Sequence, residues 1–257
     1  MKFLNVDIKN KIGSIKLDRA EIHNAFNDEL IENLTKVFID FDNNEKVQVI
    51  VLSGNGKSFC AGADLNWMSS MINYSKEENE EDSMKLAELF ETINTISKPV
   101  IGKINGAALG GGVGLVCVCD YAITHEKAKF GFTETRLGLV PAVISPYCIR
   151  KIGESNARAW FLSGERFSAH KALEMNLIHE VTSLEDFEAR SQEVVESFLM
   201  AAPIASKAAK KLIKDVVENK NHNEYTVGTI SKLRVSDEGQ EGMKALLEKR
   251  KPNWMDV

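Results

Sequence analysis

The order of hydrophobic and polar residues in the first half of the chain predicts strands interleaved with helices. Residues 4–8 and 15–17 alternate apolar with polar side chains, which is the period of a strand buried on one face. Residues 47–52 form a short β-branched run and residues 100–104 another apolar segment. Such runs are typical of strands that are covered on both faces, so a β/α core is expected.

A second period, of 3.6 residues, marks the expected helices. Asn27 offers an N-cap, and an apolar stripe then runs as far as Phe41. Another helix is expected over residues 77–96. Four more helical segments are expected near the end of the chain, at 184–200, 203–218, 223–236 and 239–250. The predicted fold class is therefore α/β, with a core over residues 1–183 and a helical C-terminal region over residues 184–257.

Composition and charge exclude several classes of protein. A chain of 257 residues with 44% hydrophobic side chains can bury a full core. The net charge of −5 argues against a nucleic-acid partner, which would need a basic face. The longest nearly apolar stretch, Ala107 to Cys119, is too short to span a bilayer, and the first residues do not resemble a secretory leader. We therefore expect a cytoplasmic protein without a membrane partner.

The four cysteines do not form a metal-ligand pattern. Cys117 and Cys119 lie two apart in an apolar run, as buried small side chains do, and Cys60 and Cys148 lie far from them in sequence. No metal site is expected, and free thiols fit a reducing compartment.

Two glycine-bearing segments are the first candidates for a functional site. Residues 58–68 (SFCAGADLNWM) come soon after the strand at 47–52, and residues 105–115 (NGAALGGGVGL) follow the strand at 100–104. Where a strand passes through small residues into a helix, unpaired backbone N–H groups point outward, and two that face one oxygen form an oxyanion hole. The glycines could instead make turns or allow close packing. The spacing is not G-x-G-x-x-G and there is no Walker lysine, so a nucleotide site is not expected.

Together with CDYAI and FGFTETRLGLVP, these two segments resemble, in series, the signatures of the enoyl-CoA hydratase/isomerase (crotonase) superfamily. The resemblance runs over nearly the whole chain, from the HNAF turn at 23–26 to EGMKALLEKRKP near the end, and GADLNWM is most similar to methylglutaconyl-CoA hydratase-like members. It implies a crotonase-like spiral of ββα turns with a helical C-terminal region that builds homotrimers, often paired into hexamers. It also implies an acyl-CoA thioester substrate and no separate cofactor, since CoA is part of the substrate.

The resemblance further implies roles for individual residues. The N–H groups of Ala63 and Gly111 would hold the thioester oxygen, where negative charge is greatest in the transition state. The basic residues 249–251 could meet the CoA phosphates or simply form a solvated helix end. CoA would lie along loops that contain His23, Ala25, Ala61, Asp64 and Leu65.

Glu134 is the candidate general acid/base. It lies where the family has its second catalytic glutamate, and an apolar pocket would raise the pKa of its carboxyl toward neutrality. The alternative is a surface glutamate paired with Arg136 or a nearby lysine. The family's first catalytic glutamate is replaced here by Gly114, so that position of the expected active site carries no carboxylate. Hydration generally uses two carboxylates, whereas double-bond migration can use one.

The resulting hypothesis is an enoyl-CoA hydratase, a lyase, that adds water to a short or branched 2-enoyl-CoA through an oxyanion-stabilised thioester enolate. A Δ3-Δ2 enoyl-CoA isomerase that uses Glu134 alone and a non-catalytic acyl-CoA-binding protein are the alternatives. Val143 and Ile144 stand where many members have glycines, and we expect them to reshape the acyl end of the pocket. Ser145 either caps the helix that follows or contacts a polar acyl group.

Overall fold

The computed structural model describes residues 1–218 and 222–255, and within them the strands form a large and a small sheet. The large sheet has an antiparallel pair at one edge and is parallel from there on. Its six strands, in spatial order, are β1 (Leu4–Lys9), β2 (Ile12–Leu17), β3 (Val49–Gly54), β5 (Val100–Ile104), β7 (Tyr121–His125) and β10 (Glu180–Thr182). The four strand segments predicted from the sequence are confirmed as β1, β2, β3 and β5.

The small sheet consists of strands of three residues. Its order is β4 (Ser58–Cys60), β6 (Ala107–Leu109), β8 (Lys129–Gly131) and β9 (Arg166–Ser168), of which the first three are parallel. Three times in succession, the chain passes from a strand of the large sheet to a strand of the small sheet and then into helical structure. The structure therefore has the α/β spiral of ββα turns that was expected.

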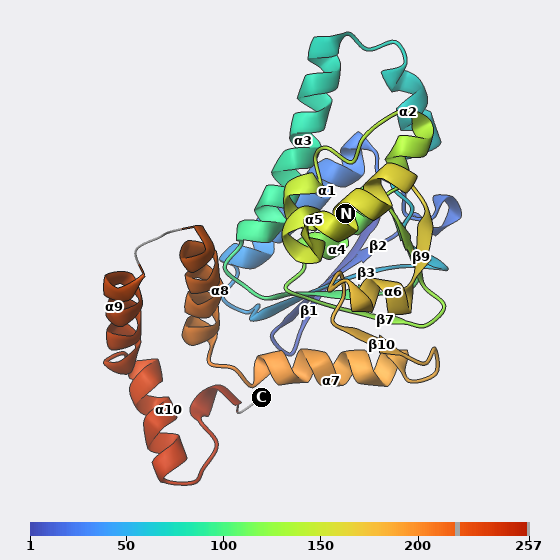
Figure 1. The fold of residues 1–257 in the computed structure, drawn as a ribbon. Coiled ribbons are helices and arrows are strands. Elements are labelled where there is room, and N and C mark those ends of the chain that lie inside the picture. Colours follow the sequence, from blue (N-terminus) through green and yellow to red (C-terminus); the bar gives the residue numbers. More distant parts are fainter. Residues whose placement is uncertain (219–221, 256–257) are drawn as a thin grey trace.

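Helices cover the large sheet on one face and extend beyond it (Figure 1). Asn27 caps α1 as predicted, since its side-chain oxygen accepts a hydrogen bond from the N–H of Leu30. Helices α1 and α3 pack against each other, and α4 is almost completely buried beneath α5. The helices of this part of the chain are α1 (Asp28–Asn43), α2 (Leu65–Met71), α3 (Lys76–Thr95), α4 (Gly111–Val118), α5 (Ser145–Ser163) and α6 (Ala169–Glu174), with 3-10 turns η1 (Ala20–Ile22) and η2 (Thr133–Leu137).

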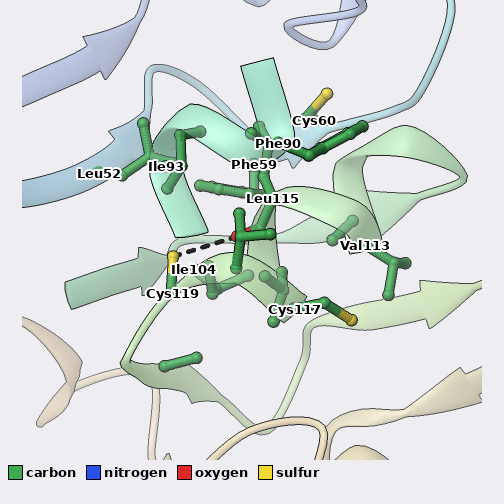
Figure 2. Close-up of a cluster of buried hydrophobic side chains, with 14 of the residues drawn as sticks. Leu52, Phe59, Cys60, Phe90, Ile93, Ile104, Val113, Leu115, Cys117 and Cys119 are labelled. Carbon is green, nitrogen blue, oxygen red and sulfur yellow. Dashed lines mark hydrogen bonds between the residues drawn. The ribbon is translucent and has the colours of Figure 1, made fainter. Parts of the chain in front are cut away.

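The main core lies between these helices and the sheets. Figure 2 shows Phe59 of β4, Phe90 of α3, Ile104 of β5 and Leu115 of α4 in one apolar cluster. The four cysteines are buried and free, which confirms for Cys117 and Cys119 the prediction that they are buried small side chains. No cluster of side chains suited to a metal ion is found among residues 1–218 and 222–255.

The last part of the chain consists of helices α7 (Phe187–Leu199), α8 (Pro203–Glu218), α9 (Asn223–Arg234) and α10 (Asp237–Leu247). They confirm the four predicted helical segments, with ends that differ by up to three residues. Phe187 and Val194 of α7 pack on Val49 and Ile101, so this helix covers the second face of the large sheet. Helices α8–α10 form a separate group at one side (Figure 1). A functional division at residues 183/184 remains a prediction.

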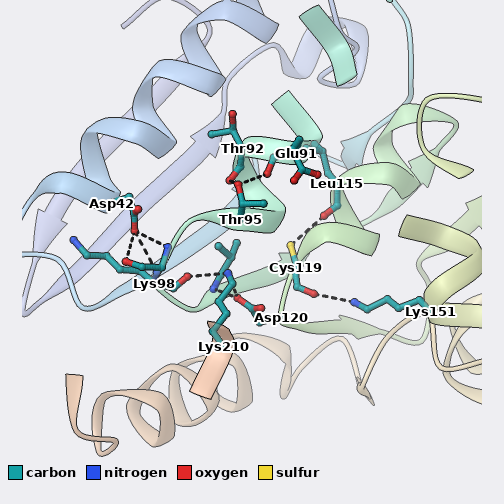
Figure 3. A network of polar contacts seen from close by, with 12 residues as sticks. Asp42, Glu91, Thr92, Thr95, Lys98, Leu115, Cys119, Asp120, Lys151 and Lys210 are labelled. Atoms are coloured by element: carbon teal, nitrogen blue, oxygen red, sulfur yellow. Dashed lines mark hydrogen bonds and ion pairs between the residues drawn. The ribbon is translucent and has the colours of Figure 1, made fainter. Parts of the chain in front are cut away.

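Three lysine side chains join the layers through backbone carbonyls (Figure 3). Buried Lys98 donates from Nζ to the carbonyls of Phe41 and Asn44 at the C-terminal end of α1. Lys151 of α5 does the same at the end of α4. Lys210 links α8 to the core, because its Nζ lies 2.7 Å from Asp120 and 3.0 Å from the carbonyl oxygen of Lys98. None of the helices in the described ranges is long and apolar enough to cross a bilayer.

Candidate active site

The carboxyl ends of three neighbouring strands bring the candidate residues to one edge of the small sheet. Strands β4, β6 and β8 are parallel, so the segments that leave them start side by side. These segments contain Ala63, Gly111 and Glu134, respectively. The sequence interpretation placed the two glycine-bearing segments after β3 and β5, as the structure does, but did not predict that each contains a short strand, β4 or β6. Strands of three small or buried residues are too short to show a period.

The backbone around Ala63 is held so that its N–H points away from the core. The N–H of Phe26 donates to the carbonyl of Gly62 at 2.7 Å, and the N–H of Asp64 donates to the carbonyl of Phe26 at 2.8 Å. Both bonds lie on one side of this extended segment, so the N–H of Ala63, which lies between them, points to the other side. Ala63 is exposed, and within the described ranges its N–H has no hydrogen-bond acceptor.

Gly111 opens helix α4 beside this segment. Gly110 precedes it with φ +52° and ψ −124°, a combination that side chains exclude, and donates its N–H to the carbonyl of Gly131 in β8. The first N–H groups of a helix have no partner within the helix, and the helix dipole favours negative charge there. A Cβ at Gly62 would be 3.1 Å from the carbonyl oxygen of Leu109, so the two turns are in close contact.

Glu134 lies in the first turn of η2 and faces the turn that precedes α4. Its Oε1 would be 3.2 Å from a Cβ at Gly110. Its Oε2 is buried and has no hydrogen-bond partner in the described part of the chain. Burial raises the pKa of the Glu134 carboxyl above its usual value. The alternative of a surface pair with Arg136 is wrong, because Arg136 contacts Glu165 at 4.0 Å and the carbonyl of Ser163.

Gly114 lies one turn into α4 and is enclosed by apolar side chains. A Cβ there would be 2.4 Å from Cγ2 of Ile144 and 2.8 Å from Cζ of Phe90. Position 114 therefore offers neither a carboxylate nor the space for one. Its part in catalysis remains a prediction.

The residues expected along CoA come together from two loops. The N–H of Ala61 donates to the carbonyl of His23, and Nδ1 of His23 lies 3.0 Å from the hydroxyl of Ser58. Ala25 is buried, whereas Leu65 is 81% exposed. These loops form one surface beside Ala63, although contact with CoA remains a prediction.

Asp64 differs from the other residues of these loops because its carboxylate is buried and fully engaged. Oδ2 lies 2.7 Å from Nη2 of Arg19, and Oδ1 accepts the N–H of Asn66 as the N-cap of α2. Hence Asp64 can offer a ligand its backbone but not its side chain. Its contact with CoA also remains a prediction.

The structure corrects the interpretation of Ser145 as a helix cap, whereas contact of the basic run 249–251 with the CoA phosphates remains a prediction. Ser145 is the first residue of α5 and does not cap it; Ile144 occupies the N-cap, and the Ser145 hydroxyl donates to the carbonyl of Ala142. Arg250, within the basic run 249–251, is bound by Glu241 at 2.6 Å and by Glu248 at 2.8 Å.

Sequence reasoning missed the residues that shape this site from a distance. Arg19 is paired with Asp64, Phe26 contacts Gly111, and Phe90 packs against Gly114 beside Ile144, which the sequence had already singled out. Each pair is separated by more than 20 residues in sequence, so no local pattern could identify it.

Comparison with known proteins agrees with this geometry. The family model described as enoyl-CoA hydratase/isomerase matches residues 7–257. A Legionella pneumophila structure assigned as an enoyl-CoA hydratase/isomerase (crotonase) is 43% identical, with a TM-score of 0.93 and 98% of both chains covered. An enoyl-CoA hydratase structure from Shewanella pealeana is 39% identical, with a TM-score of 0.94 over 98% of this chain and 96% of the other. The mitochondrial enoyl-CoA hydratase of Pongo abelii is 30% identical over 96% of this chain and 84% of its own length. The chain therefore belongs to the enoyl-CoA hydratase/isomerase family and is an enzyme of that family.

Proposed function

We propose that this enzyme is an enoyl-CoA hydratase that adds water to a 2-enoyl-CoA thioester with a short or branched acyl chain. The observation that carries the proposal is the carboxyl of Glu134, which has a buried, unpartnered oxygen and lies against the Gly110–Gly111 turn. A base in this position has a free lone pair beside two backbone N–H donors. The relatives named hydratases support the same reaction class.

In the proposed mechanism, the thioester oxygen accepts hydrogen bonds from the N–H groups of Ala63 and Gly111. As the oxygen of water bonds to C3, the carboxylate of Glu134 takes a proton from that water, and the electrons of the C2–C3 double bond move onto the thioester oxygen. The enolate then collapses, and Glu134 returns the proton to C2. Fixed donors lower this barrier because charge on the oxygen is greatest in the transition state, and one donor is typically worth roughly 3–4 kcal/mol.

One observation favours a second candidate, a Δ3-Δ2 enoyl-CoA isomerase. Phe90 and Ile144 fill the space beside Gly114, which leaves Glu134 without a companion carboxylate at that position. In this reaction Glu134 would take a proton from C2 of a 3-enoyl thioester and return it to C4, with the same oxyanion stabilised between the two steps. No water would have to be positioned.

The proposed substrate class follows from the side chains at the start of α4. Phe26 lies against Gly111, Phe90 and Ile144 lie against Gly114, and these apolar side chains suit a hydrocarbon chain of limited size. The proposal requires no resident cofactor, since CoA is carried by the substrate. A protein that only binds acyl-CoA would share this surface but would not depend on Glu134 for any reaction.

We further propose that the protein forms a homotrimer or a pair of trimers. Helices α8–α10 lie to one side and expose a set of large apolar side chains, whose burial between subunits would be favourable. Molar mass in solution tests this proposal, and a monomer would contradict it. The most exposed of these side chains are Ile213, Val217, Val235, Leu246 and Leu247.

The function is tested by incubating the purified protein with crotonyl-CoA, 3-methylglutaconyl-CoA and a 3-enoyl-CoA, beside the variant Glu134→Gln. Loss of the conjugated enoyl thioester that the variant abolishes is the expected result. If only the 3-enoyl-CoA reacts and gains conjugation, the isomerase is correct. If the thioesters bind without reacting, and bind equally to the variant, the proposed hydratase and isomerase reactions at Glu134 are both wrong.

A further inference from the structure

Arg19 is buried behind the loop that carries Ala63. Arg19 follows β2 by two residues, its side chain is 8% exposed, and its guanidinium stacks on the ring of Phe3 at 4.4 Å from the ring centre. Its two terminal nitrogens are both used on neighbouring loops: Nη1 donates to the carbonyl of Ala25 at 2.6 Å, and Nη2 donates to Asp64 at 2.7 Å. Nε finds no acceptor among the described residues, so the hydrogen bonds of the guanidinium go to these two loops.

The contacts of Arg19 lie on the two chain segments that pair at Phe26 and Ala63, and the second of these carries the free N–H of Ala63. Ala25 directly precedes Phe26, which pairs with Gly62 and Asp64 on either side of Ala63. Asp64 directly follows Ala63 and also caps α2. One guanidinium therefore joins both strands of the bridge between Phe26 and Ala63.

A buried ion pair in this place is a costly arrangement if its only role is stability. Desolvation of two charges offsets most of their attraction, and well-packed apolar side chains often stabilise a protein as much. Burial alone would raise the pKa of Asp64, but hydrogen bonds from the Asn66 N–H and from Arg19 hold this pKa below its usual value. The pair thus stays charged, and a charged pair with a planar fork has a defined geometry.

We propose that Arg19 is a positioning residue, which sets the direction of the Ala63 N–H toward the thioester oxygen through its contacts with Asp64 and the Ala25 carbonyl. This inference rests on the proposed function, in which that N–H stabilises the oxyanion. Arg19 itself touches neither substrate nor reacting atoms. A small displacement of a donor is enough to matter, since an error of about 1 Å can reduce the rate on the order of a hundredfold.

The test uses the full-length variants Arg19→Met, Arg19→Lys and Asp64→Asn, with Arg190→Met as a matched control. Arg190 also donates to a carboxylate at 2.6 Å, but its partner is Glu180 in β10, away from the site. Two quantities are measured for each folded variant. One is kcat with the enoyl-CoA substrate, and the other is the infrared stretch of an isotope-labelled carbonyl in a bound saturated acyl-CoA. The second requires no turnover.

We expect Arg19→Met to lower kcat by about 10- to 100-fold and to move the carbonyl band back toward its position in free solution. The Kd of the saturated acyl-CoA should change by less than about threefold, since most of its contacts remain. Arg19→Lys should recover part of both effects, and Arg190→Met should change neither. If Arg19→Met does not fold, Asp64→Asn decides the matter, because its amide oxygen can still cap α2 while its NH2 group cannot accept the hydrogen bond from Arg19.

A lower melting temperature with unchanged kcat and an unchanged carbonyl band would overturn the positioning role. A lower kcat in Arg19→Met, with a carbonyl band that stays at its wild-type position, would overturn it as well. If the wild-type protein itself leaves the carbonyl band at its free-solution position, the proposed oxyanion hole is wrong and the inference about Arg19 is wrong with it. A shifted wild-type band that Arg19→Met preserves contradicts the inference about Arg19 alone.

Discussion

The carboxyl of Glu134 lies against Gly110, with Oε1 3.2 Å from the place that a Cβ at residue 110 would occupy. Gly110 also turns the chain into α4 and so directs the N–H of Gly111. The proposed base and one proposed oxyanion donor are therefore positioned by the same residue. A change at Gly110 should affect both.

Gly110→Ala is expected to lower stability by about 1–3 kcal/mol, because alanine strongly disfavours φ +52° with ψ −124°. We expect kcat to fall at least about tenfold, since the donor and the carboxylate are both displaced. Thermal unfolding and steady-state kinetics measure the two effects. Gly228→Ala is the control, because a Cβ at this position of α9 meets no atom within 4 Å and alanine favours helices. Equal behaviour of the two variants would contradict the prediction.

Glu134→Gln should lower kcat by about 10²- to 10⁴-fold with little change in KM, since it removes the proton acceptor and keeps the shape. In the wild-type enzyme, kcat/KM should fall as the pH falls through the pKa of Glu134, because the base must be ionised. That inflection should lie above the usual range of a glutamate, since burial raises this pKa. A profile that is flat down to the ordinary pKa of a glutamate would count against Glu134.

The raised pKa of Glu134 also predicts an effect on stability. Activity requires the ionised carboxylate, whereas the folded state is more stable when the carboxyl is protonated. Because the folded pKa of Glu134 is raised above the unfolded one, the ionised carboxylate destabilises the folded state at neutral pH. This destabilisation disappears as the pH falls through the folded pKa toward the unfolded pKa. Glu134→Gln should therefore melt at a higher temperature than the wild type at neutral pH and at nearly the same temperature in acid. Glu165→Gln, at an exposed carboxylate, should show no such difference.

Gly114→Ala should destabilise the protein by about 1–3 kcal/mol through overpacking against Ile144 and Phe90. Ile144→Ala removes the nearer of the two contacts. In the double variant, the total loss should therefore be smaller than the sum of the single losses by about 1 kcal/mol or more. Urea unfolding of the four proteins measures this coupling. Strict additivity would show that the space beside Gly114 is filled by something other than Ile144.

Lys98→Met should lower the free energy of unfolding by about 2–4 kcal/mol, because it leaves the carbonyls of Phe41 and Asn44 buried without their donor. Lys214→Met is the control, since Lys214 is partly exposed and 3.6 Å from Glu91. Its effect should stay within about 0.5 kcal/mol. Similar losses for the two variants would show that the Lys98 ammonium contributes little to the end of α1.

Sequence patterns alone were enough to predict the elements in which a periodic pattern continues over several turns or a residue caps the helix locally. Helix α1 follows from the stripe behind Asn27, and α8 was predicted with the bounds that the structure has. The glycine-bearing segments were also visible, because they depend on residue types in a fixed order along the chain. These features are local, and local propensity and spacing determine them, whereas Glu134 was singled out only through the resemblance to the family.

Tertiary structure alone decided how these residues meet. The small sheet, which brings Ala63, Gly111 and Glu134 to one edge, is built from strands too short to have a pattern. The pair between Arg19 and Asp64 joins residues 45 positions apart. A side chain's burial, its pKa and the space around it depend on neighbours that come from distant parts of the chain. Packing therefore determines them, and the order of residues in any one segment cannot.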